Sequence, residues 1–133
     1  MNVKKIIVLL LVLLLNGCIL KTGDISNVQI INAKSNVFTN KDLNDGIKTV
    51  LNFFKKEYKG CELLNVKYVG DDKNNYDDWA KRNNKEEAIV FISDYIVHDN
   101  SYVPSLSKDK YRNWNWILVR NKGEKWILVD NGY

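Results

Sequence analysis

Between Phe38 and Gly60, apolar residues recur at helical spacing and form the strongest local pattern in the chain. Thr39 is a favourable N-cap, and Asp42 three residues later makes a capping-box-like pair with it. Gly60 suits the left-handed position that ends a helix. The pattern therefore predicts one long helix with a single apolar stripe, which we expect to face the core. The stripe consists of Leu43, Ile47, Val50, Leu51, Phe54 and Tyr58.

After this helix the apolar residues alternate with polar ones, which predicts strands. In the first strand Leu64, Val66 and Tyr68 are expected to face one way. The alternation slips near Ser93 and Asp94, which indicates a bulge or bend. Four strands are expected, at Cys61–Val69, Ala88–His98, Tyr111–Arg120 and Lys125–Asp130, with a hairpin turn at Asn121–Glu124 and a loop at Asp99–Lys110.

The remaining segments are less regular. Ile19–Asn27 is polar and is interpreted as a flexible tether, and Val28–Ala33 as an edge strand. Tyr76 and Trp79 are expected to pin a helical turn, Asn75–Arg82, onto the body. Because no strand–helix–strand alternation appears, a parallel sheet is not expected. The predicted fold class is α+β, with one long N-terminal helix packed on a curved, mainly antiparallel sheet of about four strands.

The first eighteen residues have the features of an export signal. Lys4 and Lys5 precede an apolar run, Ile6–Leu15, that is too short for a comfortable membrane span. The sequence Leu15–Cys18 then resembles a bacterial lipobox. That resemblance implies cleavage after Gly17, diacylglycerol on Cys18, and a fatty acyl chain such as palmitate on the new amino terminus. A plain secretory signal and an uncleaved anchor are the alternatives.

These signals give the expected organisation and location. Residues 1–17 are the signal peptide, residues 18–36 the lipidated cysteine and tether, and residues 37–133 a single α+β domain. The domain would be held at the extracytoplasmic face of the cell membrane through the lipid on Cys18, because two or three acyl chains anchor firmly.

Composition and charge add little to this picture. The chain has a net charge of +4, but Lys4 and Lys5 would leave with the signal, so the charge is a weak argument for nucleic acid, which we do not expect as a partner. Four Trp, seven Tyr and four Phe favour a packed core over disorder. With Cys18 lipidated, Cys61 has no disulfide partner and is interpreted as a small buried apolar residue.

Four segments together resemble a family of uncharacterised Gram-positive lipoproteins that share a domain of unknown function. They are Lys59–Cys61, Glu87–Val90, Asn113–Arg120 and the ending Lys125–Tyr133. The resemblance covers roughly Phe38–Tyr133 and implies an NTF2-like or cystatin-like fold. Members often end in Asp-Trp-Gly-Tyr, and here Asn131 replaces that Trp. The family has no established activity, so the resemblance implies no catalytic residues.

Candidate chemistry is sparse. The single histidine, His98, excludes sites that need two, and no motif for a metal, a cofactor or a phosphate loop is present. Asp94, His98 and Asp99 could form a metal or acid–base group if the bulge brought them together. A nucleophile paired with His98 has Ser93, Ser101 and Ser105 as candidates. Four acidic residues superficially resemble a calcium loop but lack its glycine and closing glutamate, and are interpreted as a solvated loop: Asp71, Asp72, Asp77 and Asp78.

Trp114, Trp116 and Trp126 are expected on neighbouring strands of the last hairpin. They can fill the core, line a small apolar pocket together with His98, or form an exposed protein-binding patch. We therefore expect a non-catalytic binding domain without a cofactor, whose partner is an envelope protein, a peptide or a small apolar ligand. The alternatives are an NTF2-like pocket enzyme that uses Asp94 and His98, and an immunity or inhibitor lipoprotein.

Overall fold

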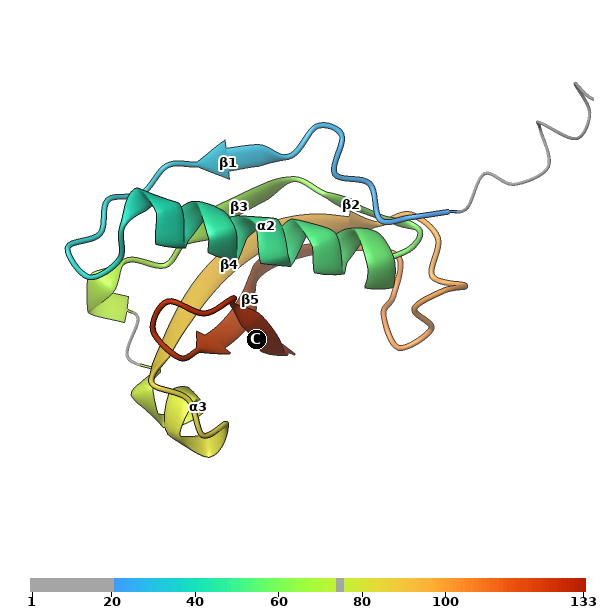
Figure 1. Cartoon of the computed structure of the whole chain (residues 1–133). Helices are drawn as coiled ribbons and strands as arrows, with labels where there is room; N and C mark the ends of the chain where they lie inside the picture. Colours follow the sequence, from blue (N-terminus) through green and yellow to red (C-terminus); the bar gives the residue numbers. More distant parts are fainter. Residues whose placement is uncertain (1–20, 74–75) are drawn as a thin grey trace, which may run out of the picture.

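The chain folds as a long helix, α2, lying across one face of a curved sheet (Figure 1). The computed structural model describes residues 21–73 and 76–133. The expected signal segment Met1–Cys18, with its lipidation cysteine, lies outside the described residues. Within them the fold is α+β, as expected, but the sheet is mixed and has six strands where the sequence predicted about four.

Helix α2, Asn40–Glu57, confirms the helix predicted from the apolar stripe. Its capping box forms as expected: the Asp42 amide donates to Thr39 Oγ1 at 3.1 Å, and the Thr39 amide donates to Asp42 Oδ2 at 2.9 Å. Such a cap is worth about 1 kcal/mol. The buried face includes Val50 and Phe54, and Gly46 on the same face lets the Phe91 ring of the sheet approach closely. A methyl group at this glycine would lie 2.6 Å from that ring.

The strands are β1 (Gln29–Ile31), β2 (Cys61–Leu63), β3 (Asn65–Tyr68), β4 (Glu87–Val97), β5 (Lys110–Arg120) and β6 (Ile127–Gly132). The spatial order is β1-β3-β4-β5-β6, with β2 also pairing with β4. All pairs between these strands are antiparallel except β1 with β3. Strands β4 and β5, each of 11 residues, form the centre of the sheet.

The expected strand Cys61–Val69 is in fact two strands. The predicted face of Leu64, Val66 and Tyr68 is wrong at its first position, because Leu63 is buried and Leu64 is only partly so. The break at Leu64 faces the predicted bulge in β4, which is confirmed between Ser93 and Tyr95. Since the Leu64 amide donates to the Asp94 carbonyl at 2.9 Å, the extra residue of the bulge is absorbed where β2 ends and β3 begins.

The segment before α2 packs on the domain, which corrects the expectation of a flexible tether over Ile19–Asn27 for the part that is described. The Gly23 amide donates to the Lys55 carbonyl at 2.9 Å, and Asp24 bridges to Glu62 in parallel orientation. Strand β1 follows within the predicted edge strand Val28–Ala33 and pairs with β3 in parallel. The domain therefore begins well before residue 37.

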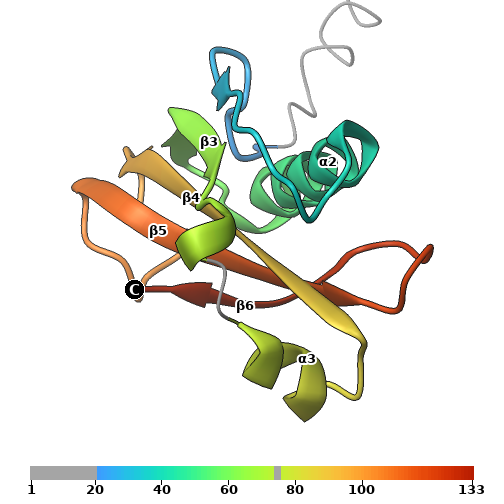
Figure 2. The ribbon, with the colours of Figure 1, turned by 90° about the vertical axis from the view of Figure 1, so that its left-hand side faces the viewer.

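A short helix, α3 (Asp77–Arg82), covers part of the opposite face of the sheet (Figure 2). As predicted, Trp79 helps to pin it, and Ala80 packs against Ala88 and Val119. A 3-10 turn, η1 (Asp71–Lys73), precedes it. The last strand starts at Ile127, later than the expected Lys125, because the preceding Trp turns into the core.

Candidate functional site

The three predicted pocket tryptophans are distributed along the core beneath α2. Trp116 is fully buried, and its ring centre lies 5.3 Å from that of Tyr58 near the end of the helix. Trp126 is 5% exposed and donates from Nε1 to the Asp42 carbonyl at the start of the helix. Trp114 is half-buried near the beginning of β5. The structure thus places these side chains at opposite ends of the helix and packs two of them as core.

His98 is not brought to the tryptophans or to Asp94. It follows β4 as an exposed side chain, and its Nε2 lies 2.9 Å from Glu62 Oε1 on β2. Asp94 lies in the bulge, where its carboxylate accepts from the Asn113 amide at 3.0 Å and from Asn65 Nδ2 at 3.3 Å. Asn113 has φ of 55°, so this carboxylate holds a left-handed residue of β5 in place. Asp94 therefore has a structural role, and its carboxylate and His98 bind different partners.

The other candidate catalytic groups are also separated. Asp99 accepts from the Ser101 hydroxyl and amide and from Lys21 Nζ, and these bonds, the Ser101 hydroxyl most strongly, hold its pKa well below the usual value. Ser93 is 1% exposed, and its hydroxyl faces the core, so it has no path to His98 at the surface. Ser105 is exposed in the loop after β4. Among the described residues, these groups do not form a nucleophile–base pair.

Of the four acidic residues expected to be solvated, Asp72, Asp77 and Asp78 are exposed as expected, and Asp71 is the exception. Asp71 accepts from the Ser35 hydroxyl at 2.6 Å, from the Asn36 amide at 2.7 Å and from the Tyr68 hydroxyl at 3.0 Å. These bonds, the Ser35 bond most strongly, lower the pKa of Asp71 and fix the turn that leads into α2. In the described ranges, no cluster of three or more His, Cys, Asp or Glu side chains could hold a metal ion.

The end of α2 packs into an aromatic cluster formed by Phe54, Tyr58, Tyr95, Tyr111, Trp114 and Trp116. Asn131 joins it, because its Oδ1 accepts from the Tyr58 hydroxyl at 2.6 Å and from Trp114 Nε1 at 3.2 Å. Within the described part of the chain, the Tyr95 hydroxyl and Trp116 Nε1 are buried without a hydrogen-bond partner. Burial raises the pKa of Tyr58 to about 12, so its hydroxyl stays protonated as a donor at neutral pH.

Cys61 lies beside this cluster. It is 2% exposed, and burial raises the pKa of its thiol to about 11. The interpretation of Cys61 as a buried apolar residue is confirmed, since a protonated thiol in such surroundings is a poor nucleophile.

The sequence reasoning missed Arg120, the most constrained charge in the molecule. Its side chain is 8% exposed at the end of β5. Nε donates to Glu87 Oε1 at 2.6 Å, and Nη2 donates to Asp42 Oδ1 at 2.9 Å. The guanidinium also lies 4.0 Å from the ring centre of Trp126, in cation–π contact. Arg120 therefore ties together the start of α2, the start of β4 and the β5–β6 hairpin.

Arg120 and Asp42 stabilise each other's charged form. Burial alone would raise the pKa of Asp42, but bonds from the Thr39 amide and the Arg120 guanidinium outweigh it and lower the pKa. For Arg120, the two carboxylates outweigh the cost of burial and raise the pKa. The alternating pattern contained a signal for this clamp, because Arg120 falls on the same face as Trp116 and a charge there needs partners.

Beside the clamp lies a groove with a volume of about 670 Å³. We call it the Arg120 groove. The first half of α2 forms one wall, the β5–β6 hairpin forms the other, and Trp126 contributes apolar surface. Exposed lysines stand on both walls, with carboxylates between them: Lys41, Lys48 and Lys125, and Asp45 and Glu124. A groove with this lining can bind a mixed-charge surface.

Comparison with known proteins adds no relative. No family model, no curated protein and no solved structure matches this chain. Among the helices of the described residues, none is long and apolar enough to cross a membrane.

Proposed function

We propose that this protein is a lipid-anchored extracytoplasmic binding protein that holds a polypeptide partner in the Arg120 groove. The support for the anchor is the sequence Met1–Cys18, with its basic start, apolar run and lipobox-like ending. The family of Gram-positive lipoproteins that the chain resembles has the same location. The support for binding rather than catalysis is the separation of Asp94, His98 and Asp99 onto different partners.

The observation that carries the groove assignment is that the clamp holds one part of the groove in place, while exposed lysines stand beside it. The Arg120 clamp fixes the groove's floor through three elements, so its shape is pre-organised and binding costs little ordering. Lys48 and Lys125 project from the two walls and have no described ion pair. They can therefore pair with carboxylates of a partner without breaking an existing bond.

The lining favours a polypeptide over a small apolar ligand. Small-molecule pockets bury most of the ligand among apolar side chains. Here the groove is open and its walls carry four cations and three carboxylates, counting the clamp residues Arg120 and Asp42. Interfaces between proteins combine a small apolar centre with a charged rim. Trp126 supplies such a centre, and the lysines supply the rim.

The fold also fits the resemblance stated above. We propose that the domain belongs with the NTF2-like or cystatin-like folds, which the resemblance implies. A long helix against a curved, mainly antiparallel sheet supports this placement. In this arrangement Phe54, Phe91 and Trp116 fill the space between the helix and the sheet. The Arg120 groove at the edge is then the site left for a partner.

Two measurements test the proposal. Mass spectrometry of the protein from native membranes should show the acyl modification on Cys18, and an unmodified thiol would refute the anchor. A photo-crosslinking amino acid in place of Thr49, which lines the groove, should give a discrete adduct with one membrane or envelope protein. The same amino acid in place of Lys67, an exposed residue of β3 that does not line the groove, is the matched position control.

Charge reversal tests the specificity of that adduct. The double change Lys48→Glu and Lys125→Glu should abolish it, because both walls would then repel an acidic partner. The pair Lys67→Glu and Lys73→Glu makes the same change in net charge on exposed residues outside the groove and should leave the adduct intact. Equal loss in both pairs would mean that net charge, and not the groove, controls the interaction.

A further inference from the structure

The first described residues are fastened to one end of the molecule. The Gly23 amide donates to the Lys55 carbonyl in the last turn of α2, and a side chain at Gly23 would collide with the Phe54 backbone. Lys21 Nζ pairs with Asp99 Oδ2 at 3.0 Å and lies 5.4 Å from the Tyr102 ring centre. The chain thus enters the domain between the end of α2 and the loop after β4 (Figure 1).

The distance from this end to Cys18 is limited by covalent geometry. Three peptide units separate Cys18 from Lys21, and each spans at most 3.8 Å between Cα atoms, so the two residues lie within about 11 Å of each other. A lipid attached at Cys18 lies in the bilayer. The end of the domain around Lys21 must then lie within about one headgroup layer of the membrane, since residues from Gly23 onward are fixed to the domain.

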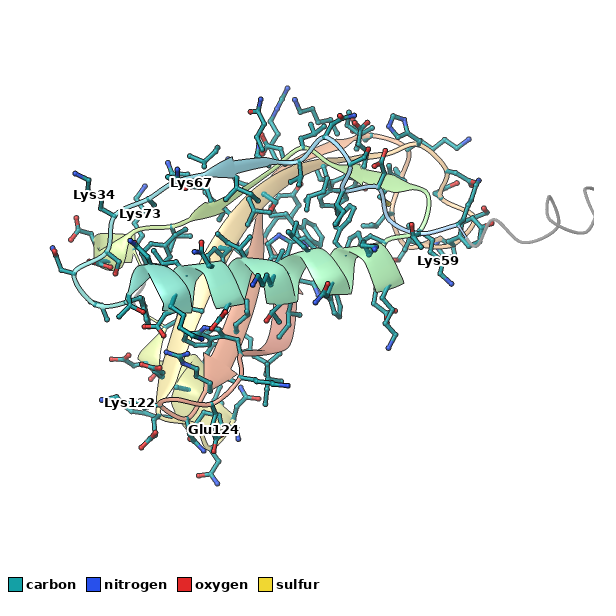
Figure 3. All side chains as sticks on the ribbon, turned by 45° about the horizontal axis from the view of Figure 1, so that its top comes forward. Lys34, Lys59, Lys67, Lys73, Lys122 and Glu124 are labelled. Carbon is teal, nitrogen blue, oxygen red and sulfur yellow. The ribbon has the colours of Figure 1, made fainter. Side chains whose placement is uncertain are left out.

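The surface chemistry of this end suits an anionic bilayer. Lys55, Lys56 and Lys59 are exposed at the end of α2, and Figure 3 shows Lys59 at the same end as the first described residues. Two acids at this end have cationic partners: Asp99 pairs with Lys21, and Glu57 lies 4.0 Å from Lys56.

Tyr102 adds an aromatic residue to this end. It is 49% exposed in the loop after β4. Tyrosine is enriched at membrane interfaces because its ring is apolar and its hydroxyl is polar.

We propose that this end of the domain, which we call the anchor face, rests on the bilayer, with Lys55 and Lys59 against anionic lipid headgroups and Tyr102 at the interface. This inference depends on the lipidation of Cys18 in the proposed function. It fixes an orientation: Lys41 lies about 20 Å along α2 from Lys55, so the Arg120 groove lies at the end of the helix remote from the anchor face, where a partner from another layer of the envelope can reach it.

The test measures the depth of two positions in the lipidated full-length protein. In a Cys61→Ala background, Tyr102→Cys and Lys122→Cys are each labelled with the same fluorophore. The protein is reconstituted into vesicles of phosphatidylcholine and phosphatidylglycerol whose headgroups carry a nitroxide quencher. Both sites are exposed, but Lys122 lies at the far end of the molecule (Figure 3). The probe at Tyr102 should be quenched several-fold more strongly than the probe at Lys122.

The controls separate the orientation from the anchor. Lys55→Glu with Lys59→Glu should reduce quenching at Tyr102 toward the Lys122 value, whereas Lys67→Glu with Lys73→Glu should leave it unchanged. If the protein has the acyl mass and floats with vesicles, but both probes are quenched equally, the anchor face is refuted and the lipid anchor stands. A chain without the acyl mass refutes the anchor and the orientation together.

Discussion

The two ends of α2 are held to the sheet in different ways. At its start, Arg120 donates to Asp42 and Glu87, and the capping box satisfies the first amides. At its far end, edge-on ring contacts hold it: the ring centre of Tyr58 lies 5.3 Å from that of Trp116 and 5.4 Å from that of Tyr95. There the Tyr95 hydroxyl and Trp116 Nε1 find no partner among the described residues. At the polar end, Arg120 hydrogen-bonds to both carboxylates of the clamp. The aromatic end is densely packed, but two of its buried polar atoms have no hydrogen bond in the described part of the chain.

The difference shows what each kind of contact contributes. Rings supply large buried area with little directional requirement, so the cluster tolerates an unbonded hydroxyl at some cost in free energy. Charges buried at the polar end require bonds in fixed directions, so that end defines where the helix and the hairpin meet. The groove proposed for binding lies at the end with fixed geometry, and the anchor face lies at the end held by rings.

The largest effect is expected from Arg120→Ala. Removing the guanidinium leaves Asp42 and Glu87 close together and partly buried, and breaking such a pair costs about 3 kcal/mol. Urea unfolding followed by tryptophan fluorescence measures it. Lys41→Ala is the control, because its pair with Asp45 is exposed at the lysine and worth about 0.5 kcal/mol or less. Equal losses for the two variants would show that Arg120 is not a clamp.

Acid should weaken the polar end before the aromatic one. The folded pKa of Asp42 lies below its unfolded value of 3.8, so its contribution is present above that pH and is lost as the pH falls through the folded pKa. Asp42→Asn should therefore be less stable than the parent at pH 6, and the difference should shrink as the pH falls below 3.8. The loss at pH 6 should be smaller than for Arg120→Ala, because Glu87 still pairs with the arginine. A difference that is constant over this range would contradict the assignment.

At the aromatic end, Tyr58→Phe should cost about 1 kcal/mol. The change removes the bond to Asn131 and leaves the ring stack in place. Thermal unfolding at neutral pH measures the loss. The Asn131 oxygen keeps its bond from Trp114, which limits the penalty. No change in stability would mean that water replaces this bond at no cost.

The same chemical change at Tyr95 should have the opposite sign. Tyr95→Phe removes a buried hydroxyl that has no described partner, so we expect no loss or a gain of about 0.5 kcal/mol. Comparing its unfolding curve with that of Tyr58→Phe uses two tyrosines whose ring centres are 5.4 Å apart. A clear loss at Tyr95 would reveal a bound water or an alternative partner and would remove the contrast between the two ends.

The sequence predicted the features that depend on neighbouring residues. The helix and its Thr39 cap, the bulge at Ser93 and Asp94, and the pinning of α3 by Trp79 are all confirmed. The helix, its cap and the bulge depend on residues a few positions apart, whereas the pinning of α3 also involves Val119 on β5. Local sequence is therefore enough to predict the helix, its cap and the bulge.

The sequence could not predict the features that depend on which strands pair. Alternation with Val66 and Tyr68 predicts Leu64 in the core, and only the facing bulge places Leu63 there instead. The sequence groups four pocket candidates because it predicts that their strands are neighbours: Trp114, Trp116, Trp126 and His98. The structure instead starts the last strand after Trp126 and turns that side chain toward Asp42, so the group is divided between the two ends of α2.

The parallel pairing of β1 has a consequence for the order in which the fold forms. Residues 29–31 come early in the chain, but their partner strand, Asn65–Tyr68, follows the whole of α2. The loop to be closed includes that helix, so β1 gains no ladder bonds until the helix and the next strands exist. Lys55 and Cys61, which bind Gly23 and Asp24, also come later. The amino-terminal segment therefore gains its backbone bonds only after α2, β2 and β3 have formed.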